Sequence, residues 1–92
     1  MSTVLKIEGD MDAAAMEHLR PKIEAVAAEG EDVVVDMGRV RFIDSSGIGG
    51  IVYMYKRLKS EGLLLSLSNL SGQPDRILRH MRVHDLLAQA GQ

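Results

Sequence analysis

Apolar and polar positions along this chain alternate between short strand-like runs and longer stretches with helical spacing. Residues 4–8, 32–37 and 63–67 are apolar runs with the length and residue types of β-strands. Over residues 13–29 and 46–60, apolar side chains recur every three or four positions, the spacing of one helix face. Strands separated by helices return to one sheet through right-handed crossovers. The pattern therefore predicts an α/β fold, with a mixed, mostly parallel sheet of three to four strands packed with about three helices.

Residues that favour helix ends flank the first two predicted helices. Asp12 is the expected N-cap of the helix at 13–29, and Gly30 is its expected C-cap. Gly62 lies just past the helix at 46–60. The capping residues therefore agree with the boundaries that the apolar spacing indicates.

The last third of the chain is less regular. The run at 63–67 is apolar enough to lie in the middle of a sheet. Pro74 is expected at the first position of a third helix, in which Met81 is one of the inward-facing residues. Residues 83–87 fit either a loop or a short final strand.

The polar motif Asp44-Ser45-Ser46-Gly47-Ile48-Gly49-Gly50 stands where a loop passes into the second predicted helix. The first turn of a helix has free N–H groups and the positive end of the helix dipole, so an anion such as a phosphoserine is stabilised there. A second explanation of the Asp and Ser residues needs no function, because both are preferred N-cap residues of helices. A cap does not explain three glycines, which are poor helix formers and leave the backbone accessible to another molecule.

Composition limits the classes of function. The 92 residues make a single domain over 1–92, and the absence of Cys excludes a disulfide framework and a thiolate zinc site. With no apolar run of about 20 residues and no signal peptide, the expected location is the cytoplasm and no membrane contact is predicted. Aromatic residues make up 3% of the chain and the net charge is −2, so no nucleic-acid partner is predicted.

The serines lack the neighbours that enzymatic chemistry needs. A Ser hydroxyl is a poor nucleophile without an adjacent base, and the three histidines lie on other predicted elements. His80 and His84 are four positions apart, but no third ligand for a metal is evident. We therefore predict no enzymatic activity, no catalytic residue, no metal and no cofactor.

The motif also resembles a known family. Residues 42–49, following the strand-like run at 33–37, resemble the STAS domain, and in particular its branch of anti-sigma factor antagonists. Gly9-Asp10-Met11-Asp12 resembles the entry into that family's first helix, and residues 71–86 resemble its third helix with the apolar segment after it. The resemblance covers residues 4–87. Since STAS domains usually have a further strand at the start and a strand and helix at the end, it implies a fold shortened at both ends.

The resemblance also implies a function. In antagonists of this branch, the Ser that follows Asp is phosphorylated by a partner kinase of the GHKL type, which is also the anti-sigma factor. The unphosphorylated antagonist binds this kinase and frees the sigma factor, and a PP2C-like phosphatase resets the switch. By position, Ser45 is the phosphoacceptor. The partner-binding residues implied at the same place are Asp12, Asp44, Ser46, Gly47, Gly49 and Gly50.

Three further hypotheses stay open at this stage. The chain could be a STAS subunit that never cycles through phosphate, for example in a lipid-transport ATPase complex, although such subunits often lack a Ser at the acceptor place. It could also be a switch that controls secretion or polysaccharide production instead of a sigma factor. Finally, an exposed sheet edge invites pairing with another chain, so a weak homodimer is possible.

Overall fold

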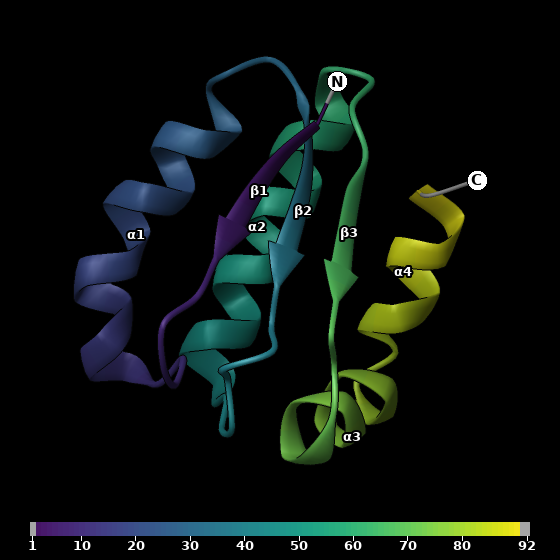
Figure 1. The fold of residues 1–92 in the computed structure, drawn as a ribbon. Coiled ribbons are helices and arrows are strands. Elements are labelled where there is room, and N and C mark those ends of the chain that lie inside the picture. Colours follow the sequence, from purple (N-terminus) through teal and green to yellow (C-terminus); the bar gives the residue numbers. More distant parts are fainter. Residues whose placement is uncertain (1, 91–92) are drawn as a thin grey trace.

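Three strands and four helices follow one another in the computed structural model, which describes residues 2–90 (Figure 1). The strands are β1 (Ser2–Lys6), β2 (Asp32–Asp36) and β3 (Leu65–Ser68). The helices are α1 (Ala13–Ala27), α2 (Ser45–Ser60), α3 (Gly72–His80) and α4 (Val83–Ala90). The strand order is β1-β2-β3 and both pairings are parallel, with Val4, Val34 and Ser66 in register. The predicted α/β class is confirmed, and the described part of the sheet is wholly parallel.

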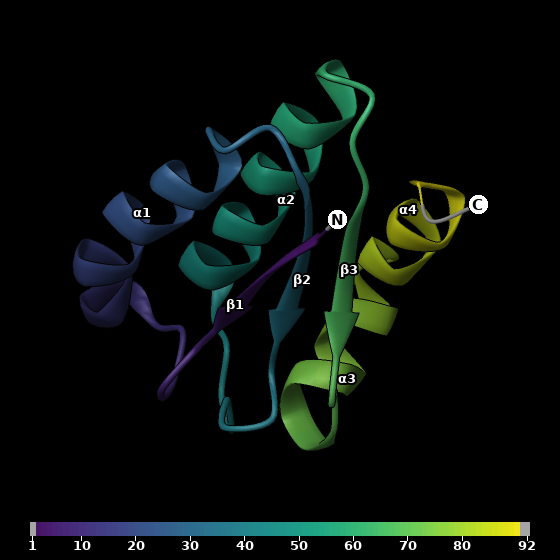
Figure 2. The same cartoon turned by 45° about the horizontal axis from the view of Figure 1, so that its top comes forward.

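The helices cover one face of this sheet. Figures 1 and 2 show α1 and α2 side by side behind the strands, with α4 along β3. Alternate strand residues such as Leu5, Val35 and Leu65 are buried on this side. On the opposite face Val4 is 62% exposed, and within residues 2–90 no helix covers it. The core therefore lies in one layer between the sheet and the helices.

Of the capping predictions for the first two helices, those at Asp12 and Gly62 are confirmed and the one at Gly30 was wrong. Helix α1 ends at Ala27 with Ala28 as its C-cap, because the Ala28 N–H already closes the last turn on the Glu24 carbonyl, and Gly30, with a φ of 77°, lies in the loop beyond it. The Asp12 carboxylate accepts a hydrogen bond from the Ala15 N–H at 2.8 Å and caps α1. At the end of α2, Gly62 has a φ of 75°, a conformation that glycine adopts without strain. The Leu63 N–H donates to the Leu58 carbonyl at 2.8 Å in the same turn. Because Leu63 closes the helix in this way, the third strand begins at residue 65 and not at 63.

Two predictions for the last third of the chain were wrong. The run at 63–67 does not lie in the middle of the sheet, since β3 is at its edge and β2 is central. Residues 83–87 form neither a loop nor a strand but belong to α4. Val83 and Leu87 are four positions apart and both are buried, so a helical turn brings both into the core. Arg82, with a φ of 62°, separates α4 from α3.

The third helix also begins earlier than predicted. Ser71 precedes it as the N-cap, so Pro74 is its third residue and not its first. Pro74 is still tolerated, because the N–H groups of the first turn have no partner within the helix. Met81, predicted to face inward, lies just past the helix and is 56% exposed.

Candidate functional site

The loops that follow β1 and β2 are joined just before the two long helices. Met11 and Ile43 form an isolated parallel bridge: the Met11 N–H donates to the Phe42 carbonyl at 3.0 Å, and the Asp44 N–H donates to the Met11 carbonyl at 3.3 Å. The side chains of Met11 and Ile43 are fully buried. The next residue after each, Asp12 or Asp44, caps a helix, so the bridge sets the N-termini of α1 and α2 next to each other.

Asp44 connects these two helix N-termini directly. Its Oδ1 accepts hydrogen bonds from the N–H groups of Ser46 at 2.9 Å and Gly47 at 3.2 Å, which caps α2. Its Oδ2 accepts a hydrogen bond at 3.0 Å from the N–H of Ala13, the first residue of α1. Two positive helix ends therefore share one carboxylate, a favourable arrangement for a negative charge.

The expectation of free N–H donors at the start of α2 was wrong for Ser46 and Gly47, because Asp44 occupies both. The backbone carbonyl of Asp44 also accepts from the Ile48 N–H at 3.0 Å. Ser45 is exposed as the first residue of α2, and within residues 2–90 no hydrogen bond involves its hydroxyl. A phosphate on Ser45 would therefore stand beside an existing carboxylate and not in an empty anion site.

The three glycines of the motif have three different surroundings. A Cβ on Gly47 would collide with the Met11 carbonyl and lie 2.6 Å from Cγ1 of Ile43. A Cβ on Gly50 would lie 2.5 Å from Cε of Met16, a residue of α1. A Cβ on Gly49 would meet nothing within 4 Å. Internal packing thus accounts for Gly47 and Gly50, whereas Gly49 is exposed on the outer face of α2.

All the residues predicted for the site come together at the start of α1 and α2. Ser45 and Gly49 are exposed, Asp12, Asp44 and Ser46 are half-buried, and Gly47 and Gly50 are buried. Partner contact by these residues stays a prediction. For Asp12, Asp44, Gly47 and Gly50, capping or packing within the chain is already a sufficient reason for the residue type.

Gln73 is a residue of this site that the sequence analysis missed. Its side-chain Oε1 accepts a hydrogen bond from the Ile43 N–H, and its Nε2 donates to the Ile43 carbonyl, both at 2.9 Å. Gln73 lies in the first turn of α3, 30 positions along the chain from Ile43. No periodicity or motif marks it, because a single polar residue in the first turn of a helix is ordinary.

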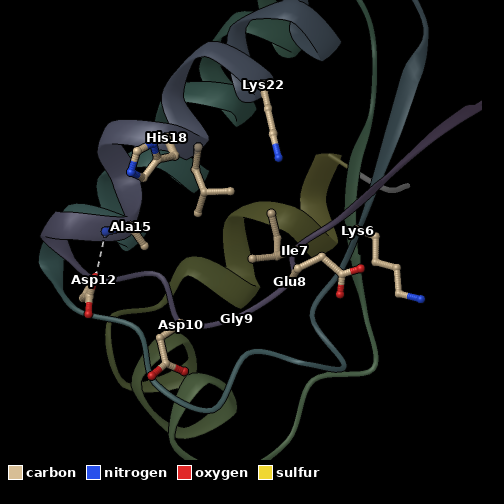
Figure 3. A pocket seen from close by; sticks show the side chains of 10 residues that line it. Lys6, Ile7, Glu8, Gly9, Asp10, Asp12, Ala15, His18 and Lys22 are labelled. Carbon is tan, nitrogen blue, oxygen red and sulfur yellow. Dashed lines mark hydrogen bonds between the residues drawn. The ribbon is translucent and has the colours of Figure 1, made fainter.

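An open pocket of about 440 Å³ lies beside the capped end of α1 (Figure 3). Figure 3 shows Lys22 and His18 of α1 and Lys6 of β1 around it, with Asp12 at one end. Glu8, Asp10 and Asp12 also line it, so both signs of charge are present. Within the described residues, no group of three His, Cys, Asp or Glu side chains comes together to hold a metal. The lining therefore favours no one class of small ligand.

Within residues 2–90, two ionisable groups have clearly shifted pKa values, and both lie outside the motif. Asp36 at the end of β2 accepts hydrogen bonds from the Asn69 side chain at 2.9 Å and from the Gly38 N–H at 3.0 Å, which lower its pKa. The Tyr53 hydroxyl, at 3.2 Å from Arg57, raises the pKa of that guanidinium. Both groups keep their usual charge near neutral pH.

We predict that Gly49→Ala stabilises the domain by up to about 1 kcal/mol, because Ala is the better helix former and its Cβ meets nothing. Gly49→Leu should also keep the fold, since the same space is open, but should block a partner that docks on the predicted surface. Melting temperature and partner affinity, measured on both variants, check the two effects. A Gly49→Leu variant with wild-type affinity would remove Gly49 from the predicted interface.

Comparison with known proteins shows which family the chain belongs to. The family model of the STAS domain matches residues 2–90. The anti-sigma-B factor antagonist of Bacillus subtilis is 33% identical over 75 residues, which are 82% of this chain and 66% of that relative, just under two thirds.

Within residues 2–90, none of the helices combines the length and hydropathy needed to cross a membrane.

Several solved structures share the fold. A sulfate transporter family protein from Wolinella succinogenes has a TM-score of 0.78 at 18% identity, covering 97% of this chain and 74% of that one. The Bacillus anti-sigma factor antagonist SpoIIAA has a TM-score of 0.69 at 22% identity in its unphosphorylated form, covering 91% of this chain and 86% of SpoIIAA. Its phosphorylated form has a TM-score of 0.72 at 23% identity, covering 92% and 78%. With its family model matched over nearly the whole chain, this protein belongs to the STAS domain family.

Proposed function

We propose that this chain is a partner-switching regulator that binds an anti-sigma factor with serine kinase activity and is released when Ser45 is phosphorylated. One observation carries the proposal: Ser45 is exposed at the first position of α2, between Asp44 and the Ser46 and Gly47 N–H groups that the Asp44 carboxylate caps. A kinase can reach its hydroxyl without unfolding the domain. The relation to an anti-sigma-B factor antagonist and the solved phosphorylated form of SpoIIAA support the same role.

The charge of a phosphate on Ser45 is large enough to switch partner binding off. The phosphate adds about −1.5 to −2 charges at neutral pH. Its repulsion from Asp44 is present both in the free protein and in the complex, so it does not change the affinity. The affinity falls when the phosphate faces an acidic group of the partner, because that repulsion exists only in the complex. At about 6 Å and an effective dielectric of about 20, one such contact is worth roughly 3 kcal/mol, or about a hundredfold in affinity.

The partners that fit this proposal are an ATP-binding kinase of the GHKL type and a PP2C-like phosphatase, acting in the cytoplasm. In this role the chain is a binding protein and not an enzyme. The controlled target can be a sigma factor, secretion or polysaccharide production, because the same switch chemistry serves each of them.

A STAS module that never cycles through phosphate is the second candidate. The fold similarity to a sulfate transporter family protein, with its TM-score of 0.78, favours it. A subunit of a lipid-transport ATPase complex would be one example of such a module. Such a role would need the same docking surface but no modification of Ser45, so a phosphorylation experiment separates the two candidates.

We predict that the kinase recovered by co-purification phosphorylates the protein at Ser45 with ATP, as mapped by mass spectrometry. Ser45→Ala should block the reaction and keep partner affinity, because only an exposed hydroxyl is removed. The phosphorylated wild type should bind the kinase about a hundredfold more weakly while melting close to the unmodified protein.

Ser46→Ala is the matched control for the site of modification, since it removes the neighbouring hydroxyl: the phosphate should still map to Ser45, even where the variant binds the partner more weakly. Modification mainly at Ser46 would contradict the assignment of Ser45. A protein that binds its partner stably but is modified at neither serine would favour the non-cycling candidate.

A further inference from the structure

We propose that Gln73 is a positioning residue for phosphorylation, because its side-chain amide clamps the backbone that presents Ser45 to the kinase. The inference rests on the proposed function. It assigns a role in that function to a residue of α3, which is remote in sequence from the Asp44-Ser45 motif.

The Ile43 segment is hydrogen-bonded on both of its edges. On one edge, Met11 accepts from the Asp44 N–H and donates to the Phe42 carbonyl. On the other edge, Gln73 accepts from the Ile43 N–H and donates to the Ile43 carbonyl. In a strand, the polar groups of successive residues point to opposite edges, so Gln73 completes the pattern that a third strand would supply. Its amide takes the place of a strand backbone on the β3 side.

The clamp acts two residues before the phosphoacceptor. Asp44, between Ile43 and Ser45, has an extended backbone with φ −109° and ψ −171°, and the helix begins directly after it. A shift of Ile43 therefore moves the capping carboxylate and the Ser45 hydroxyl together. The two bonds are part-buried, so a peptide that loses both partners must pair with water instead, and the segment is then no longer held in one position.

Gln73 is also the link between α3 and this segment. Among the side-chain hydrogen bonds of residues 2–90, only its two bonds join α3 to residues 41–44. Gln73 is half-buried and is not among the residues predicted to contact the partner. Loss of the clamp should therefore affect the placement of the hydroxyl more strongly than the docking of the kinase.

The test is the kinetics of Ser45 phosphorylation by the co-purified kinase, with this protein as the varied substrate. Gln73→Met keeps the length of the side chain and removes both hydrogen bonds. We expect kcat to fall about tenfold with KM within twofold of the wild type, since a small misplacement of a reacting group slows a reaction strongly. Hydrogen exchange of the Ile43 amide, followed by NMR, should become about tenfold faster because its acceptor is lost.

Gln73→Glu is the second variant, for use if Gln73→Met does not fold. Its carboxylate still accepts from the Ile43 N–H but cannot donate to the Ile43 carbonyl, so kcat should fall at least about threefold. Ile77→Val, a mild change on the same helix, is the control for a general loss of stability. It should leave kcat and the exchange of the Ile43 amide near wild-type values.

Each outcome decides the proposal. A Gln73 variant with wild-type kcat and fast Ile43 exchange would show that the clamp is only structural, and would overturn the positioning role. An equal fall in kcat for Ile77→Val would also overturn it, because stability would then be the cause. If the kinase does not phosphorylate wild-type Ser45, the proposed function fails first and the positioning role with it. In that case the Ile43 exchange rates still report whether the clamp forms.

Discussion

Gly47→Ala is expected to destabilise the domain by about 3 kcal/mol or more, which corresponds to a melting temperature lower by about 12 °C or more for a domain of this size. The added Cβ would collide with the Met11 carbonyl and lie 2.6 Å from Cγ1 of Ile43. The backbone carbonyl is held by its hydrogen bond from the Asp44 N–H and cannot rotate away. The change should therefore separate the Met11–Ile43 bridge, and thermal or urea unfolding measures its cost.

Gly50→Ala is the matched control, three positions further along the same helix. Its Cβ would lie 2.5 Å from Cε of Met16, which is the end of a flexible side chain that can move. The loss should therefore be clearly smaller, at about 1 kcal/mol. A Gly47→Ala variant that melts like the wild type would show that the two loops are not joined as closely as the bridge requires.

Asp44→Ala is expected to have the next largest effect, a loss of about 3 kcal/mol. A lost N-cap accounts for about 1 kcal/mol, and the lost charge-assisted bond to the Ala13 N–H for roughly 2 kcal/mol. The effect is larger than that of an ordinary cap because this carboxylate serves α1 as well as α2. Chemical unfolding of the variant measures the loss.

Asp12→Ala is the control for Asp44→Ala. Within residues 2–90, the Asp12 side chain accepts one hydrogen bond, from the Ala15 N–H, and it caps α1 alone. It should destabilise the domain by about 1 kcal/mol. Equal losses for the two variants would mean that the bond from Asp44 to Ala13 contributes nothing. The comparison also shows how to interpret partner binding by Asp44 variants, because a weaker complex could follow from a displaced helix alone.

Features that depend on neighbours along the chain were predicted from the sequence. The N-cap at Asp12 and the turn at Gly62 were both predicted, because a capping side chain and a left-handed glycine act within a few residues. The helix after the Asp-Ser-Ser-Gly motif was also predicted to within one residue, because its buried face recurs at helical spacing. The place of Ser45 at the start of that helix follows from the same local pattern.

Features that depend on contacts between distant segments were decided by the tertiary structure. The run at 63–67 has the composition of a central strand, yet β3 lies at the edge, because strand order is set by how the helices cross over the sheet. Whether residues 83–87 form a strand or a helix depended on which partner buries Val83 and Leu87. A short apolar segment fits either structure by itself.

The same division holds within the site. Local residue preferences are enough to place Asp44 and Ser45 at a helix N-terminus. The fold as a whole is needed to show that Asp44 also binds α1, that Gly47 touches Met11 and that Gln73 clamps Ile43. These contacts join residues about 30 or more positions apart. The spacing of apolar residues along one segment shows which of its side chains are buried. It does not show which distant segment buries them.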